Sequence, residues 1–81
     1  MAKRTAYQRV LSTLKKYSKK GVTTDEVEQI TGMPHQTASA RINEIYNDGM
    51  AEVTGLTRNT RYGRPAYVYF YVSPVKILVL S

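Results

Sequence analysis

The chain contains no cysteine and only one histidine among its 81 residues. Without cysteine it cannot form disulfides, thiolate-bound zinc sites or a thiol nucleophile, and a single histidine cannot build a histidine-rich metal site. No apolar run reaches the roughly 18 residues of a membrane-spanning helix. The polar, basic start of the chain does not fit a secretory signal. These absences favour a cytoplasmic protein that needs no metal or cofactor and does not enter a membrane.

Catalytic patterns are absent as well. No serine–histidine–acid set surrounds His35, no glycine-rich phosphate loop follows a strand, and the acidic residues fall at helix starts and on surfaces. We therefore expect no catalytic residues and no enzyme.

The length leaves room for one domain with a small core. With 42% hydrophobic and 22% charged residues, the chain is typical of a globular protein. We place a single domain over residues 1–81, with its core at about residues 5–72 and an apolar C-terminal tail at residues 73–81. The tail could form an added strand, pack on the first helix or serve as a homodimer interface.

The charge is strongly positive and falls in blocks. Twelve Lys and Arg face six Asp and Glu, for a net charge of +6. Residues 1–20 and 53–81 carry no acid, whereas residues 21–52 carry all six acids and a single base. Two basic blocks favour a polyanionic partner, first nucleic acid and then an anionic membrane. The alternative is an ordinary solvated surface.

The first helix is predicted over residues 5–17. Its helically spaced stripe is Tyr7, Val10, Leu11, Leu14 and Ser18. Gly21 is expected just beyond the end of the helix, and the isolated Val22 could form a short strand bridge.

A second helix is predicted to begin at a capping box, in which Thr23 and Glu26 satisfy each other's backbone N–H groups. Val27 and Ile30 supply its expected buried stripe, and Gly32 ends it.

A third helix is predicted from Pro34 or His35 to Asn47, with a buried stripe of Ala38, Ile42 and Ile45.

Two extended segments follow. Residues 50–57 are predicted to form the first, residues 58–65 a basic loop, and residues 66–72 a strong aromatic strand. In that strand we expect Val68, Phe70 and Val72 to face the core. The alternating Tyr67, Tyr69 and Tyr71 would then lie on an outer face, either as a stacking platform for single strands or, as we favour, in cross-strand packing.

Two helices joined by a tight turn at residues 32–34 indicate a helix-turn-helix, whose second helix enters the major groove. Opposite its buried stripe, that helix carries small and amide side chains where an ordinary surface helix would carry charges. Gln and Asn can pair with adenine, Ser and Thr can contact bases or phosphates, and Ala allows close approach. The candidate DNA-binding residues here are His35, Gln36, Thr37, Ser39, Ala40, Arg41 and Asn43.

The basic loop is the second candidate element for DNA binding. It has three arginines and no acid, and an arginine at a hairpin tip can enter a narrow minor groove. The candidate residues are Arg58, Arg61, Tyr62 and Arg64. The alternative is a solvated hairpin loop.

Four segments together resemble small bacterial and phage winged helix-turn-helix domains. Residues 21–32 (GVTTDEVEQITG) are similar to the opening of such domains, and residues 34–45 (PHQTASARINEI) to their recognition helix. Residues 48–53 (DGMAEV) resemble the step from helix to strand, and residues 61–69 (RYGRPAYVY) the wing and its return strand.

This resemblance covers roughly residues 5–72 and implies an α+β winged helix-turn-helix with three helices followed by a β-hairpin wing. It further implies binding of double-stranded DNA, usually in transcriptional control, within the nucleoid or, for a phage protein, in the host cytoplasm. The effector domain and long dimerisation helix of common regulators are not recognisable in this sequence.

The sequence thus predicts a small, phage-type transcriptional regulator that binds specific double-stranded DNA. The alternative is a protein-interaction module that docks on a host polymerase or nuclease, because a fold does not fix a function. A third interpretation is a binder of single-stranded or structured nucleic acid through the tyrosines.

Overall fold

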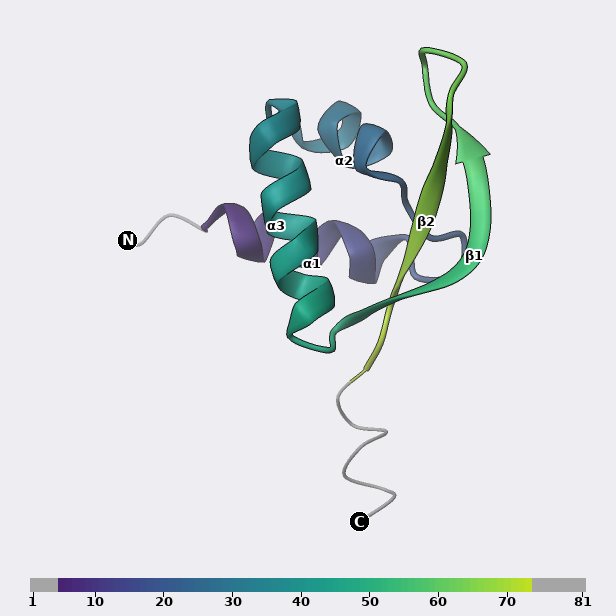
Figure 1. Ribbon diagram of the computed structural model, residues 1–81. Helices are drawn as coiled ribbons and strands as arrows, with labels where there is room; N and C mark the ends of the chain where they lie inside the picture. Colours follow the sequence, from purple (N-terminus) through teal and green to yellow (C-terminus); the bar gives the residue numbers. More distant parts are fainter. Residues whose placement is uncertain (1–4, 74–81) are drawn as a thin grey trace.

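A computed structural model describes residues 5–73 of the chain, which form three helices followed by a two-stranded antiparallel hairpin (Figure 1). Of the predicted apolar tail, only Ser73 falls within this range. The α+β class and the order of the elements are as predicted. The elements are α1 (Ala6–Lys16), α2 (Thr24–Thr31), α3 (His35–Asn47), β1 (Ala51–Asn59) and β2 (Pro65–Tyr71).

Local signals set the helix boundaries. The Thr5 hydroxyl accepts a hydrogen bond from the backbone N–H of Gln8 and caps α1. Both halves of the predicted capping box are formed at the start of α2, and that helix ends at Gly32 in a left-handed conformation with φ of 75°. Pro34 stands just before α3, where its missing N–H removes no helical hydrogen bond.

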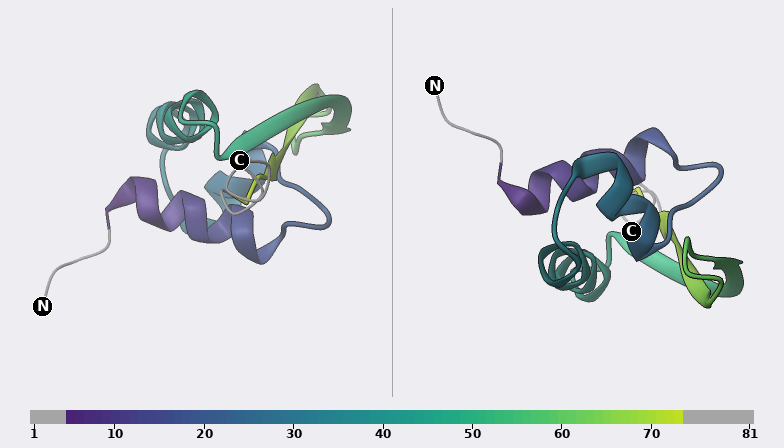
Figure 2. Two further views of the ribbon diagram at one scale, coloured as in Figure 1. Left: turned by 90° about the horizontal axis from the view of Figure 1, so that it is seen from below. Right: turned by 90° about the horizontal axis from the view of Figure 1, so that it is seen from above.

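The core lies where the three helices meet the start of the hairpin. Figure 2 shows α3 end-on while α1 lies in the plane of view, so the two helices cross steeply. The cluster of buried apolar residues is Val10, Leu14, Val22, Val27, Met33, Ala38, Ile42, Ile45 and Ala51. The predicted stripe of α3 is therefore confirmed, and Tyr7 and Leu11 of the α1 stripe pack at the edge of the cluster.

Two of the predicted core positions are wrong. Ser18 is exposed because α1 ends at Lys16 and the stripe does not continue as a helix. Ile30 is 47% exposed. Three residues of helix advance the chain by about 300°, so Ile30 lies about 60° around α2 from the buried Val27. It points into a groove between α1 and α2 instead of into the core.

The hairpin strands pair from Ala51 opposite Tyr71 to Asn59 opposite Pro65, with a register irregularity between Val53 and Thr57. The predicted bridge at Val22 is also formed, because its backbone exchanges two hydrogen bonds with Tyr69. Val22 therefore lies beside β2 on the side away from β1. This arrangement is compatible with a winged-helix layout.

The basic loop is shorter than predicted. β1 continues through Asn59 and β2 begins at Pro65, so Arg58 lies in a strand instead of a loop. The turn is closed by hydrogen bonds from Thr60 N–H to the Arg64 carbonyl oxygen and from Gly63 N–H to the Thr60 carbonyl oxygen. We call residues 60–64 the hairpin tip.

Val68 is buried as predicted, but the prediction of which face of β2 meets the helices is wrong. Tyr69 and Tyr71 pack against the helical core. Val68 is fully buried on the opposite face, where a Cβ atom on Gly21 would lie 2.5 Å from Val68 Cγ1 and 2.8 Å from Phe70 Cε1. The turn that precedes Val22 therefore covers the second face of the strand.

The tyrosines consequently do not share an outer surface. Tyr67 is 59% exposed, whereas the other two tyrosines of β2 are half-buried. Val72, also predicted to face the core, is half-buried just beyond the end of β2. A stacking platform of three exposed tyrosines is excluded by this geometry.

Candidate nucleic-acid interface

Packing of α3 on the core turns its amide-rich side to solvent. Ala38, Ile42 and Ile45 are at most 1% exposed. On the opposite side, Gln36 and Asn43 are exposed. Between them, Ser39 and Ala40 are half-buried small residues, so the centre of this face is low enough for close approach of a ligand.

The same face carries little net charge. Arg41, one of its predicted DNA-binding residues, is half-buried and forms an ion pair with Glu44, with Nη2 and Oε2 2.9 Å apart. Thr37 is also half-buried. Recognition through this face would therefore depend on hydrogen bonds and shape more than on charge.

Arg58 is held by groups of the chain itself. Its Nη1 donates to both carboxylate oxygens of Glu26, at 2.6 and 2.8 Å, and its Nη2 donates to the Lys20 carbonyl oxygen at 2.8 Å. The same Glu26 carboxylate accepts the Thr23 N–H in the capping box. This ion pair fixes β1 to the start of α2.

Arg61 is held in a similar way by Asp25. Its backbone N–H donates to Oδ2 at 3.0 Å, and its Nε donates to Oδ1 at 2.8 Å. Asp25 is 6% exposed, and its carboxylate also accepts a hydrogen bond from Gln29. The backbone N–H of Arg61, followed by its guanidinium, lowers the pKa of Asp25, and the same contact raises the pKa of Arg61.

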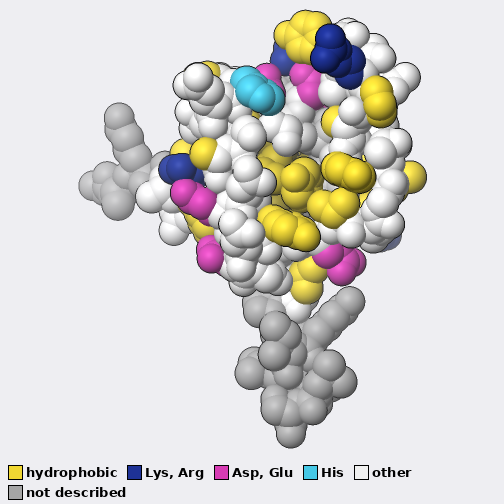
Figure 3. All heavy atoms as spheres, in the orientation of Figure 1, with side chains coloured by type: hydrophobic (Ala, Val, Ile, Leu, Met, Phe, Trp, Pro, Cys, Tyr) yellow, Lys and Arg dark blue, Asp and Glu magenta, His cyan; other side chains and the backbone are white. Residues whose placement is uncertain are grey.

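Glu28 joins the first residue of α3 to the hairpin tip. One carboxylate oxygen lies 2.7 Å from His35 Nδ1, and the other accepts a hydrogen bond from Arg61 Nη2 at 3.2 Å. In Figure 3 the histidine and the cations of the hairpin tip lie around acidic side chains at the upper edge of the molecule. The start of α3 and the hairpin tip are therefore held in one relative position.

Two predicted residues of the hairpin tip remain open to a ligand. Tyr62 is 75% exposed, and the guanidinium carbon of Arg61 lies 5.2 Å from its ring centroid. The side chain of Arg64 forms no ion pair with any carboxylate of residues 5–73. Together with His35, Tyr62 and Arg64 line a hollow of about 400 Å³ between the tip and the starts of α2 and α3.

The structure thus brings together four of the predicted site residues, namely His35, Arg61, Tyr62 and Arg64. Asn43 lies two turns further along α3, and Arg58 contacts a different set of groups, Glu26 and the carbonyl oxygen of Lys20 in the turn after α1. That these residues contact DNA stays a prediction.

Sequence reasoning missed the residues that hold the hairpin in place. They are the acidic side chains of α2, namely Asp25, Glu26 and Glu28, which we call the acidic triad. In the sequence they indicate only a favourable helix start. The available signal was an acidic block and an arginine block of opposite charge in one small domain.

An apolar surface adjoins this site. Figure 3 shows hydrophobic side chains gathered between α3 and the hairpin. Tyr46 of α3, 47% exposed, meets Tyr69 of β2 edge-on, with ring centroids 6.2 Å apart and planes at 83°. Burial raises the pKa of Tyr69. This contact fixes the hairpin to α3 at its base.

Residues 5–73 offer neither a metal site nor a membrane-spanning helix. The described residues, 5–73, contain no group of three or more His, Asp or Glu side chains that could hold a metal ion. Within the same part of the chain, every helix is too short or too polar to cross a membrane. Neither the models of known protein families nor the curated proteins include a match to this chain.

Proposed function

We propose that the chain is a winged helix-turn-helix domain that binds specific double-stranded DNA, as a small phage-type transcriptional regulator. In this proposal α3 enters the major groove and the hairpin tip lies on the neighbouring backbone or minor groove. The observation that carries it is the double contact of Glu28 with His35 and Arg61, because it fixes the two DNA-facing elements relative to each other before DNA arrives.

The chemistry of α3 supports sequence-specific contacts. Gln36 and Asn43 are exposed on one side of the helix and lie about 10.5 Å apart along its axis, or roughly three base steps. Both side chains suit bidentate pairing with adenine N6 and N7. Ala40, between them, leaves space for a base edge or a thymine methyl group.

The three arginines of the hairpin make different contacts, so we assign them different roles. Arg64 is the arginine of the tip that no described carboxylate neutralises, so it is the main candidate for a phosphate contact. Arg61 is 41% exposed and keeps part of its guanidinium open while Asp25 and Glu28 hold the rest. Arg58 chiefly positions the hairpin in this proposal.

Selection of bound sequences from a random pool of duplexes tests the proposal. We expect enrichment of a short motif with adenine–thymine pairs at the positions facing Gln36 and Asn43. A motif with dyad symmetry would indicate a dimer, for which half-sites about one helical turn apart are expected. Failure to enrich any duplex at low salt would overturn the proposal.

A second candidate function is a protein-interaction module. The observation that favours it is the apolar surface between α3 and the hairpin, where Tyr46 and Tyr67 are 47% and 59% exposed. A stoichiometric protein complex that Tyr46→Ser disrupts, together with no binding of any duplex, would decide for this function.

A further inference from the structure

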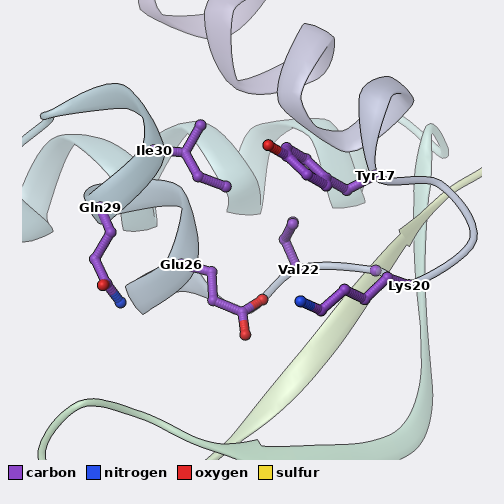
Figure 4. Close-up of a pocket in the computed structure, with 7 residues that line it drawn as sticks. Tyr17, Lys20, Val22, Glu26, Gln29 and Ile30 are labelled. Atoms are coloured by element: carbon purple, nitrogen blue, oxygen red, sulfur yellow. The ribbon is translucent and has the colours of Figure 1, made fainter.

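A groove runs between α1 and α2, apart from α3 and the hairpin tip. It consists of two hollows of about 250 Å³ each, which adjoin because both are lined by Tyr17 and Ile30. In Figure 4 the side chains of Tyr17 and Ile30 face each other across it, with Val22 at its base. We call it the α1–α2 groove.

The middle of the groove is apolar. Ile30 is 47% exposed although it lies on a helix whose neighbouring Val27 is fully buried. The half-buried ring of Tyr17 forms the facing wall. The half-exposed side chain of Ile30 therefore offers a contact area for an apolar side chain of a ligand.

The ends of the groove are basic. Arg9 and Lys16 line one hollow, and Lys20 lines the other. Neither lysine forms an ion pair with a carboxylate of residues 5–73. Among the described residues that line the groove, the one acidic residue is Glu26, and Arg58 already neutralises it.

We propose that the α1–α2 groove binds an acidic segment of a partner protein, with one apolar side chain seated on Tyr17 and Ile30. Carboxylates on either side of that side chain would meet Arg9 and Lys16 at one end and Lys20 at the other. The observations favour a peptide over nucleic acid, because phosphates would gain nothing from the apolar middle. The groove lies outside the proposed DNA-facing elements, so both ligands can bind at once.

Titration of ¹⁵N-labelled full-length protein tests this proposal. The probe is a synthetic peptide of Asp and Glu residues with one central leucine. Two control peptides replace the leucine by serine, or all acids by Asn and Gln. We expect the amide signals of residues around Tyr17 and Ile30 to shift with the first peptide, and each control peptide to bind at least about tenfold more weakly.

Matched variants test whether the peptide binds in the α1–α2 groove. Ile30→Gln should weaken the leucine peptide at least about tenfold, whereas Leu56→Gln, which changes a similarly exposed residue of β1, should not. Lys16→Gln should weaken it more than Lys19→Gln, because Lys19 does not line the groove.

Any of several results would overturn the proposal. They are no binding of the leucine peptide, equal binding of the leucine and serine peptides, and equal effects of Ile30→Gln and Leu56→Gln. Displacement of the peptide from the groove by duplex DNA would also overturn it and would assign this surface to nucleic acid. Duplex selection by α3 is measured separately, so failure here leaves the proposed function standing.

Discussion

Asp25 and Arg61 are joined by two hydrogen bonds, one from the backbone N–H and one from the guanidinium Nε, at 3.0 and 2.8 Å. The contact joins the first turn of α2 to the hairpin tip. On the tip, both the backbone and the side chain of Arg61 take part in it. Because Asp25 accepts these hydrogen bonds as a carboxylate, the position of the tip depends on its ionisation.

The first prediction concerns Asp25→Asn. The variant loses charge at this contact, so we expect lower stability at neutral pH and faster exchange of the amides of residues 60–64. Since the folded pKa of Asp25 lies below its ordinary value of 3.8, its contribution is complete above that value and is lost as the pH falls through the folded pKa. Chemical denaturation at several pH values should show this loss in the wild type and a flatter profile in the variant.

A second prediction separates the two roles of Glu26, which caps α2 and pairs with Arg58. Thr23→Ala removes the other half of the capping box and should cost about 1 kcal/mol of unfolding free energy. Glu26→Gln can keep the cap, because glutamine also serves in a capping box, but it loses the ion pair. We therefore expect Glu26→Gln, unlike Thr23→Ala, to loosen β1 near Arg58 in hydrogen exchange.

A third prediction tests the packing of Gly21 against β2. Gly21 and Gly32 have nearly equal φ values of 74° and 75°, but a Cβ atom added at Gly21 would meet side chains within 4 Å, whereas one added at Gly32 would meet none. Gly32→Ala should cost roughly 1–2 kcal/mol for the left-handed backbone alone. Gly21→Ala should cost about 1–3 kcal/mol more, because the new methyl group overlaps Val68 and Phe70. Equal losses in thermal or urea unfolding would contradict this packing.

A fourth prediction compares two isoleucines. Ile45 is fully buried on α3 and Ile30 is 47% exposed. Ile45→Ala should therefore lower the unfolding free energy by about 2–5 kcal/mol. Ile30→Ala should stay within about 0.5 kcal/mol of the wild type, because few core contacts are removed. Urea denaturation of both variants measures the difference.

Much of the fold could be predicted because local chemistry decides it. The Thr23–Glu26 capping box, Gly32 and Pro34 mark the ends of helices through hydrogen bonds and backbone angles that neighbouring residues determine. The stripe of Ala38, Ile42 and Ile45 was equally clear, since the 13 residues of α3 span several helical turns.

The wrong or missing predictions have a common origin, because long-range contacts decide these features. In the eight residues of α2, periodicity did not show that Ile30 would face a groove. On β2 both faces are apolar, so the sequence did not show that Tyr69 and Tyr71 would meet the core while the turn at Gly21 covered Val68. The exposed face of α3 followed from its period, whereas the ion pairs of the acidic triad with the hairpin join residues more than 30 positions apart.

The measurement that tests the central claim most directly is the salt dependence of binding to the selected duplex by the wild type, Arg64→Ala and Asn43→Ala. We expect wild-type affinity to fall steeply with salt, and Arg64→Ala to weaken all duplexes alike and reduce the log–log slope by about 0.9. Asn43→Ala should leave the slope unchanged and weaken the selected sequence most, by roughly 1–3 kcal/mol. Salt-independent binding, or identical behaviour of the two variants, would contradict the account.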